Sequence, residues 1–165
     1  MSTTEIYGIE KNGNVVPYGS AQNSWLGAMH VWNTLSEEYG MGESLMFGFN
    51  RTWKAFNTGI YKDYENIVLG STFDYVIVMK EHFKPLLNGF GKYFAAHPNS
   101  NFGEQIEVIK SMELDENIIG VAWCQTSVAD DLWDFAYDEE NDETIPYNIY
   151  KGDKHQNLFK ELVGY

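Results

Sequence analysis

The sequence is poor in cysteine, arginine and proline. Among its 165 residues there are four prolines and one cysteine, and Arg51 is the only arginine among eleven basic residues. Cys124 alone cannot form an intramolecular disulfide, which fits a reducing compartment. The N-terminus has neither the basic nor the apolar region of a signal peptide, and no apolar run approaches membrane-spanning length. We therefore expect a cytoplasmic protein with no membrane partner.

Motifs for metal, nucleotide and nucleic-acid chemistry are also missing. No two of the four histidines lie at the spacing of metal ligands, and the chain has no cysteine pair. Neither of two glycine clusters follows an expected strand and opens a helix, so nothing predicts a phosphate-binding loop. Lysines are scattered and outnumbered by acids, which excludes the basic patch that direct nucleic-acid binding needs. We expect no metal, no cofactor and no enzymatic activity.

Basic residues are absent above all from the segment with the most charge. Residues 130–143 contain eight carboxylates and no Lys, Arg or His, and residues 104–165 carry fifteen acids against four bases. Like charges at this density repel one another. The segment must face water, hold a cation or meet a basic surface. The glycine and terminal glutamate of a calcium-binding EF-hand loop are not in register, so a basic surface is the stronger prediction.

This acidic segment is our candidate partner-binding site, and we expect it to be a loop or a marginal helix. Trp133, Phe135 and Tyr137 alternate with other positions, so in an extended segment they would share one apolar face between the carboxylates. Alternatively, the aromatic side chains fold back and anchor a solvated loop to the core. The residues predicted to bind the partner are Asp130, Asp131, Trp133, Asp134, Tyr137, Asp138, Glu139, Glu140, Asp142 and Glu143.

Hydrophobic periodicity predicts an α+β fold in a single domain spanning residues 1–165. Asn12-Gly13 suits a type I′ turn between two β-branched stretches, which predicts an N-terminal β-hairpin, and Pro17 places its second strand at a sheet edge. We expect a small, mostly antiparallel sheet packed by four to five helices. The expected strands are 5–10, 14–18, 73–79, 118–126 and 146–150, and the expected helices are 24–39, 45–58, 81–96, 102–112 and 154–163.

A second candidate site lies at the end of the strand expected over 118–126. Cys124 and the hydroxyl groups of Thr126 and Ser127 could line a pocket there, since sites often form at strand ends. A lone cysteine in an apolar strand is usually an inert core residue. No Gly-x-Ser-x-Gly motif accompanies these residues. A small enzyme or ligand-binding domain with a pocket near Cys124–Ser127 is therefore the alternative prediction.

The chain resembles small acidic proteins of phages and mobile elements of low-GC bacteria. The likeness lies in its size, its net charge of −13, its single arginine and its lack of catalytic motifs. Proteins of this kind inhibit host enzymes, and toxin-neutralising immunity proteins share the same general properties. The resemblance involves no matching motif, so it implies no role for any residue.

Taken with the charge pattern, the resemblance predicts an acidic inhibitor of a protein that handles nucleic acid. The partner would be a host restriction or CRISPR nuclease, or a nuclease toxin, met in the cytoplasm of the host cell. Binding would rest on nucleic-acid mimicry or on charge complementarity, because strong negative potential attracts basic surfaces. A toxin-neutralising immunity protein, a structural subunit that acts by assembly, and a homodimer remain as alternatives.

Overall fold

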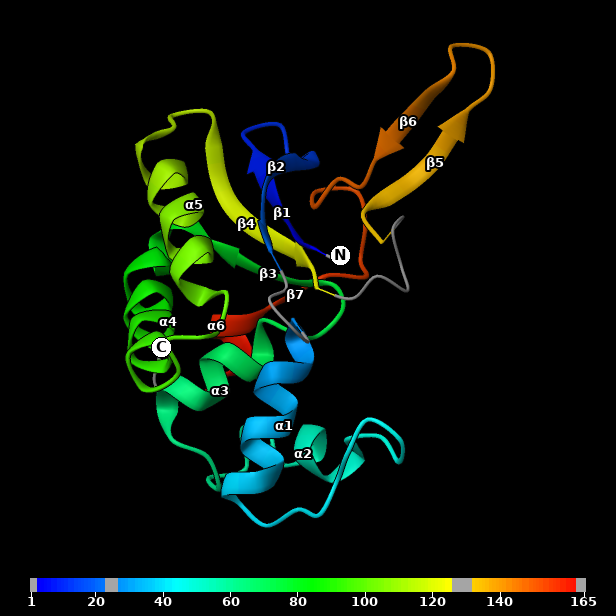
Figure 1. Cartoon of the computed structure of the whole chain (residues 1–165). Helices are drawn as coiled ribbons and strands as arrows, with labels where there is room; N and C mark the ends of the chain where they lie inside the picture. Colours follow the sequence, from blue (N-terminus) through cyan, green and yellow to red (C-terminus); the bar gives the residue numbers. More distant parts are fainter. Residues whose placement is uncertain (1–2, 23–26, 126–131, 163–165) are drawn as a thin grey trace.

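A five-stranded sheet, a separate two-stranded hairpin and six α-helices make up the described part of the chain, residues 3–22, 27–125 and 132–162, in a computed structural model (Figure 1). The strands are β1 (Thr3–Glu10), β2 (Val15–Gln22), β3 (Val76–Met79), β4 (Ile118–Cys124), β5 (Asp134–Asp138), β6 (Glu143–Pro146) and β7 (Gln156–Asn157). The helices are α1 (Ala28–Glu38), α2 (Asn50–Lys54), α3 (Asp63–Gly70), α4 (Phe83–Ala96), α5 (Phe102–Leu114) and α6 (Leu158–Glu161), with a 3₁₀ turn, η1 (Lys80–His82), before α4.

The main sheet has the order β2-β1-β4-β3-β7. Every pairing is antiparallel except that of β3 with β7. This confirms the α+β class and the mostly antiparallel sheet, and the described residues form six α-helices where four to five were expected. Among the described residues, no helix has both the length and the apolar character needed to cross a membrane.

The N-terminal hairpin forms as expected. β1 pairs with β2, and β2, which contains Pro17, is an edge strand of the sheet. Gly13 has a φ angle of +91°, but Asn12 is not among the described residues with positive φ, so the turn is not the expected type I′. Instead, the side chain of Asn12 accepts a hydrogen bond from the backbone N–H of Asn14 at 3.0 Å.

Alternating residues of the central strands divide the core between the two faces of the sheet. One face, with Ile6, Val121 and Trp123, packs against the helices. The other face, with Ile9 and Cys124, forms a second apolar cluster. Leu132, Trp133 and Tyr147, from the chain on either side of the two-stranded hairpin, cover this second face. The hairpin is therefore rooted in the core on the side of the sheet opposite the helices.

Two of the expected elements do not form, and one helix was not expected. The helix expected over 45–58 is replaced by a tight turn at 44–48 and the short α2. The strand expected over 146–150 does not form, and β6 ends at Pro146. Helix α3 was not expected. At its start the carboxylate of Glu65 accepts a hydrogen bond from the backbone N–H of Lys62 at 2.9 Å, as in a capping box. Helix α1 begins at Ala28, and the start expected for it at residue 24 lies outside the described residues.

Candidate functional site

The acidic segment is a β-hairpin rather than the expected loop or marginal helix. β5 and β6 pair antiparallel, with Tyr137 opposite Thr144 and Asp138 opposite Glu143. The register shifts between Asp134 and Ala136, which places a bulge at Phe135. The two strands pair with each other and belong to no other sheet of the described chain. In Figure 1 the hairpin projects from the body of the molecule.

Hydrogen bonds at its root join the two arms of the hairpin and hold them to the main sheet. The backbone N–H of Tyr147 donates to the carbonyl of Trp133 at 2.8 Å, and the N–H of Val15 donates to the carbonyl of Tyr147 at 2.8 Å. The indole N–H of Trp133 donates to the carbonyl of Trp123 in β4, also at 2.8 Å. Buried hydrogen bonds of this kind fix direction because breaking one leaves an unpaired polar group. The hairpin thus leaves the core at a defined place.

The turn at the tip of the hairpin is closed by one of its own carboxylates. Asp138 accepts hydrogen bonds from the backbone N–H of Glu140 at 3.1 Å and from the side-chain amide of Asn141 at 2.8 Å. Asp142 adopts a positive φ of +52°, which aspartate tolerates better than most residues. The hydrogen bonds from Asn141 are the main cause of a lowered pKa at Asp138, so this carboxylate stays charged. The local hydrogen bonds explain how a turn of like charges can form.

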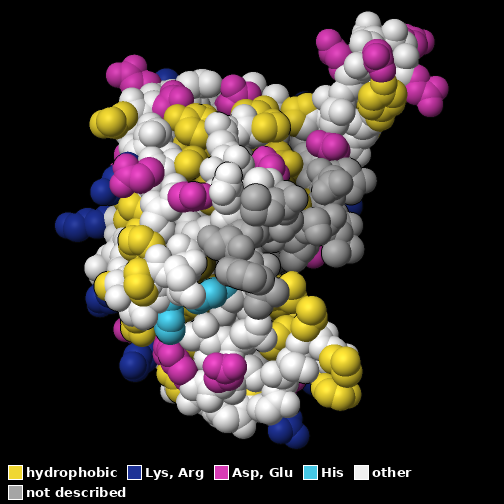
Figure 2. Space-filling model, in the orientation of Figure 1, with side chains coloured by type: hydrophobic (Ala, Val, Ile, Leu, Met, Phe, Trp, Pro, Cys, Tyr) yellow, Lys and Arg dark blue, Asp and Glu magenta, His cyan; other side chains and the backbone are white. Residues whose placement is uncertain are grey.

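Six carboxylates lie on the described hairpin, and residues 132–146 contain no basic side chain. Figure 2 shows carboxylates grouped around the tip, away from the lysines of the body. Asp138 and Glu143 stand directly opposite each other across the strands, a like-charge arrangement that disfavours pairing. The hairpin therefore presents a concentrated negative charge, and a cationic surface would relieve its repulsion. The carboxylates are those of Asp134, Asp138, Glu139, Glu140, Asp142 and Glu143.

Most of the residues predicted to bind a partner are exposed, but the prediction is wrong for Trp133. Trp133 is 1% exposed and packs edge-on against Tyr75 and Tyr147, so it anchors the hairpin and cannot belong to the exposed surface. Phe135 and Tyr137 are 73% and 56% exposed, and the bulge breaks the shared face expected for the three aromatic residues. The predicted residues Asp130 and Asp131 lie outside the described part of the chain.

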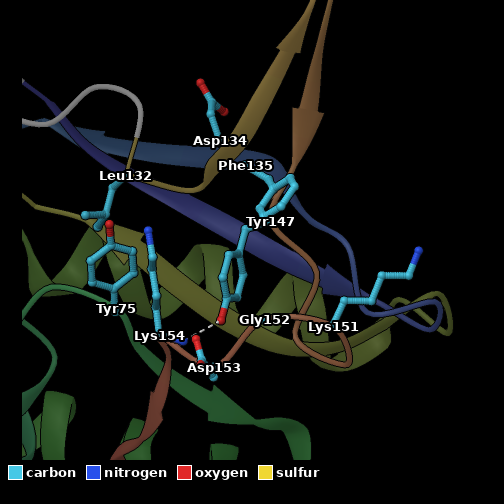
Figure 3. Close-up of a pocket in the computed structure, with 9 residues that line it drawn as sticks. All are labelled: Tyr75, Leu132, Asp134, Phe135, Tyr147, Lys151, Gly152, Asp153 and Lys154. Atoms are coloured by element: carbon cyan, nitrogen blue, oxygen red, sulfur yellow. Dashed lines mark hydrogen bonds between the residues drawn. The ribbon is translucent and has the colours of Figure 1, made fainter.

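A hollow of about 440 Å³ lies at the root of the hairpin (Figure 3). Tyr75, Phe135 and Tyr147 supply aromatic walls, and Lys154 rises between the rings of the two tyrosines. A smaller hollow of about 260 Å³, lined partly by Ile145 and Phe135, adjoins it and shares Tyr147. Nothing in the sequence predicted this site, because its walls come from the residue before β3, from β5 with the residue before it, and from the chain between β6 and β7.

The floor of the larger hollow is set by the hydroxyl group of Tyr147. This oxygen accepts hydrogen bonds from the backbone N–H groups of Lys154 at 3.0 Å and His155 at 3.3 Å, and it lies 2.7 Å from Nδ1 of His155. Burial lowers the pKa of His155 below 6.5, and the carboxylate of Asp153 opposes that shift. A Cβ atom at Gly152 would lie 2.5 Å from the ring of Tyr147, so the absence of a side chain there lets the ring pass.

The described part of the alternative site near Cys124–Ser127 is a buried cysteine. Cys124 is buried in the sheet and lines neither hollow at the hairpin root. Thr126 and Ser127 lie outside the described residues. A buried thiol in apolar surroundings reacts slowly, so Cys124 has the character of a core residue.

A second exposed surface, which the sequence reasoning missed, lies on the turn before α2. Leu45, Met46 and Phe47 are exposed, with Met46 at 85%. The carboxylate of Glu43 holds this turn by accepting hydrogen bonds from the N–H groups of Arg51 and Thr52 at 2.8 and 2.7 Å. Three large apolar side chains are thus displayed on a turn of fixed shape.

Comparison with protein-family models, with curated protein sequences and with solved structures finds no match for this chain. Within the described residues, no group of three or more His, Cys, Asp or Glu side chains is arranged to hold a metal ion.

Proposed function

We propose that this chain is an acidic inhibitor protein that binds the basic surface of a nucleic-acid-handling partner through the β5–β6 hairpin. The observation that carries the proposal is a projecting hairpin with six carboxylates, no basic residue over 132–146 and a root fixed in the core. A groove that binds a duplex is lined with Lys and Arg to meet phosphate charge. Carboxylates on a fixed hairpin would meet the same cations and exclude the nucleic acid.

The exposed aromatic residues add to this mode of binding. Phe135 and Tyr137 lie among the carboxylates and are accessible to a partner. Proteins that bind single strands stack bases on aromatic or guanidinium groups, and an aromatic side chain can occupy such a place. Charge would then speed encounter, while apolar burial near the centre of the contact would slow dissociation.

The test compares two triple variants with the same change in charge. Glu139, Glu140 and Glu143 on the hairpin are replaced by Lys in one variant, and Glu107, Glu113 and Glu116 on or after α5 in the other. All six side chains are exposed, so both variants should fold. Each protein is tested for inhibition of DNA cleavage by purified restriction, CRISPR and toxin nucleases, with excess duplex DNA as competitor.

The hairpin variant should lose inhibition, the α5 variant should keep most of it, and competitor DNA should relieve inhibition by the unchanged protein. Equal loss in both variants would mean that net charge acts without a defined surface. No inhibition of any nuclease in the panel, with no nucleic-acid-binding protein captured from lysate at low salt, would overturn the proposal.

A further inference from the structure

The exposed apolar side chains of the described chain gather in two segments of opposite charge. Of ten large apolar side chains that are exposed, five lie within residues 45–60 and four within residues 135–150. Residues 40–62 contain three basic residues and one acid, whereas residues 135–150 contain five acids and no base. Apolar side chains exposed together are typical of interaction sites. The first five are Leu45, Met46, Phe47, Trp53 and Ile60, and the other four are Phe135, Tyr137, Ile145 and Tyr150.

The first segment forms an apolar turn followed by two exposed cations on α2. We call it the turn surface, and its members are Leu45, Met46, Phe47, Arg51 and Lys54. The acid of this segment, Glu43, is engaged by the backbone N–H groups of Arg51 and Thr52, which leaves the two cations for a partner. The hydroxyl of Ser36 also bonds to the backbone of Glu43, donating to its carbonyl at 3.1 Å and accepting its N–H at 3.0 Å. A turn held in this way loses little conformational freedom on binding.

The hairpin offers the features that match the turn surface. Phe135, Ile145, Pro146 and Tyr147 contribute apolar walls to the smaller hollow at its root, which has a volume of about 260 Å³. Met46 on the turn surface is 85% exposed, and an unbranched methionine side chain adapts well to an irregular apolar hollow. The carboxylates of the hairpin have the sign that attracts the cations of α2. Each surface therefore supplies what the other lacks.

The two surfaces lie apart within one chain. In Figure 1 the hairpin and the turn before α2 lie toward the two ends of one side of the molecule. Figure 2 shows apolar side chains gathered near the lower end and carboxylates around the hairpin at the upper end. Two copies related by a two-fold axis can place each turn against the hairpin of the other copy, so that the contact forms twice and the assembly closes at two copies.

We propose that the turn surface binds the β5–β6 hairpin of a second copy of this chain, in a two-fold dimer. Met46 enters the hollow at the hairpin root, and Arg51 and Lys54 pair with hairpin carboxylates. Fully buried aromatic side chains contribute roughly 150–250 Å² each, so these surfaces, each used twice, can supply the roughly 1,200–2,000 Å² of a stable interface. Contact between two hairpins is disfavoured because both carry negative charge.

One pair of substitutions tests the apolar part of the contact. Sedimentation equilibrium measures the dissociation constant of the dimer. Met46→Ser should weaken the dimer by at least about tenfold, because a large apolar side chain buried at the centre of a contact contributes much of its binding energy. Leu114→Ser removes a side chain that is 87% exposed at the end of α5, and as the matched control it should change the dissociation constant by less than about twofold.

An exchange of charges tests which surfaces meet. Replacing Arg51 and Lys54 by Glu makes the turn surface acidic, and the variant with Lys at 139, 140 and 143 makes the hairpin basic. Each variant alone should be monomeric, because its two surfaces then carry the same sign. An equimolar mixture should form a dimer with one copy of each, because every acidic surface then meets a basic one. The variant with Lys at 107, 113 and 116 has the same net charge as the hairpin variant and should not bind the acidic-turn variant. Circular dichroism verifies that each variant keeps its fold.

The dimer is refuted by a monomeric mass at every concentration up to about 1 mM. Equal weakening by Met46→Ser and Leu114→Ser, or a mixture of the charge variants that stays monomeric, would place the contact elsewhere. Binding of monomeric protein to phosphatidylglycerol vesicles, lost in Met46→Ser, would assign the turn to a membrane surface instead. The inference does not depend on the proposed inhibitor function. The acidic-turn variant keeps every hairpin carboxylate, so it should lose the dimer and inhibit a nuclease at least as well as the unchanged protein.

Discussion

Trp133 joins the acidic hairpin to the body of the molecule. Its indole is buried against Tyr75 and Tyr147, and its N–H satisfies the carbonyl of Trp123. Trp133→Ala should lower the free energy of unfolding by about 3–5 kcal/mol, the cost of emptying a large buried aromatic site. Urea denaturation measures this, and Phe135→Ala, which removes an exposed ring, should cost less than about 0.5 kcal/mol. Similar values for the two would mean that Trp133 does not anchor the hairpin.

Cys124 provides a second test at the scale of one residue. The side chain is buried in β4 within the apolar cluster on the hairpin side of the sheet. The native protein should resist a thiol reagent that labels the urea-unfolded chain quickly, because a buried thiol rarely forms the reactive thiolate. Labelling is followed by mass spectrometry. Equally fast modification of native and unfolded protein would restore the strand end as a candidate reactive site.

At the scale of elements, the hairpin carries a repulsive pair that one substitution can reverse. Asp138 and Glu143 are directly opposed, and Asp138 also closes the turn. Glu143→Lys should turn repulsion into attraction and make the pairing of β5 with β6 more stable. Amide hydrogen exchange in β5 and β6 should slow, while exchange in the main sheet stays the same. Faster exchange in the hairpin would contradict the register.

Helix α2 depends on a carboxylate from the preceding turn. Glu43 accepts hydrogen bonds from the N–H groups of Arg51 and Thr52 and from the hydroxyl of Thr52. Burial opposes the charge of Glu43, but these bonds outweigh burial and lower its pKa below 4.5. A pKa lower in the folded state means that this stabilisation is present above about pH 4.5 and is lost as the pH falls through the folded value.

Glu43→Ala should therefore lower the free energy of unfolding by about 0.5–2 kcal/mol at neutral pH, the usual cost of losing a helix cap. The difference from the unchanged protein should shrink on acidification below about pH 4.5. Urea denaturation at the two pH values measures both effects. Glu107→Ala, at an exposed site on α5, is the control and should change stability little.

The sequence predicted the elements whose signals are local. The Asn12-Gly13 turn between its two flanking stretches was enough for the N-terminal hairpin, and the apolar stretch over 118–126 was enough for β4. The acidic hairpin was missed because charge repulsion alone argued against paired strands. Asp138 closes the turn by local hydrogen bonds, but the contacts that fix the root of the hairpin are non-local, because they come from the carbonyls of Trp123 and Trp133 and the N–H of Val15. The hollow at the hairpin root was not predicted either, because its lining residues come from separate parts of the chain.

At the scale of the whole molecule, the net charge of −13 makes salt the main test of partner binding. The association rate should fall steeply between about 50 and 500 mM salt, because screening acts within roughly 10 Å at 0.1 M. Phe135→Ala should speed dissociation and leave the salt dependence of association unchanged, because it removes apolar area and no charge. Surface plasmon resonance separates the two rates. A flat association rate would place the contact away from the hairpin.

The hairpin strands pair with nothing else in the described chain, whereas their root is fixed by Trp133 and Tyr147. Their length is therefore free to change without any adjustment of the sheet. Inserting two residues in each strand would extend the reach by roughly 7 Å and keep every side chain on its face. A lineage carrying this fold could follow a partner whose binding groove deepens or narrows by insertion or deletion at this one place.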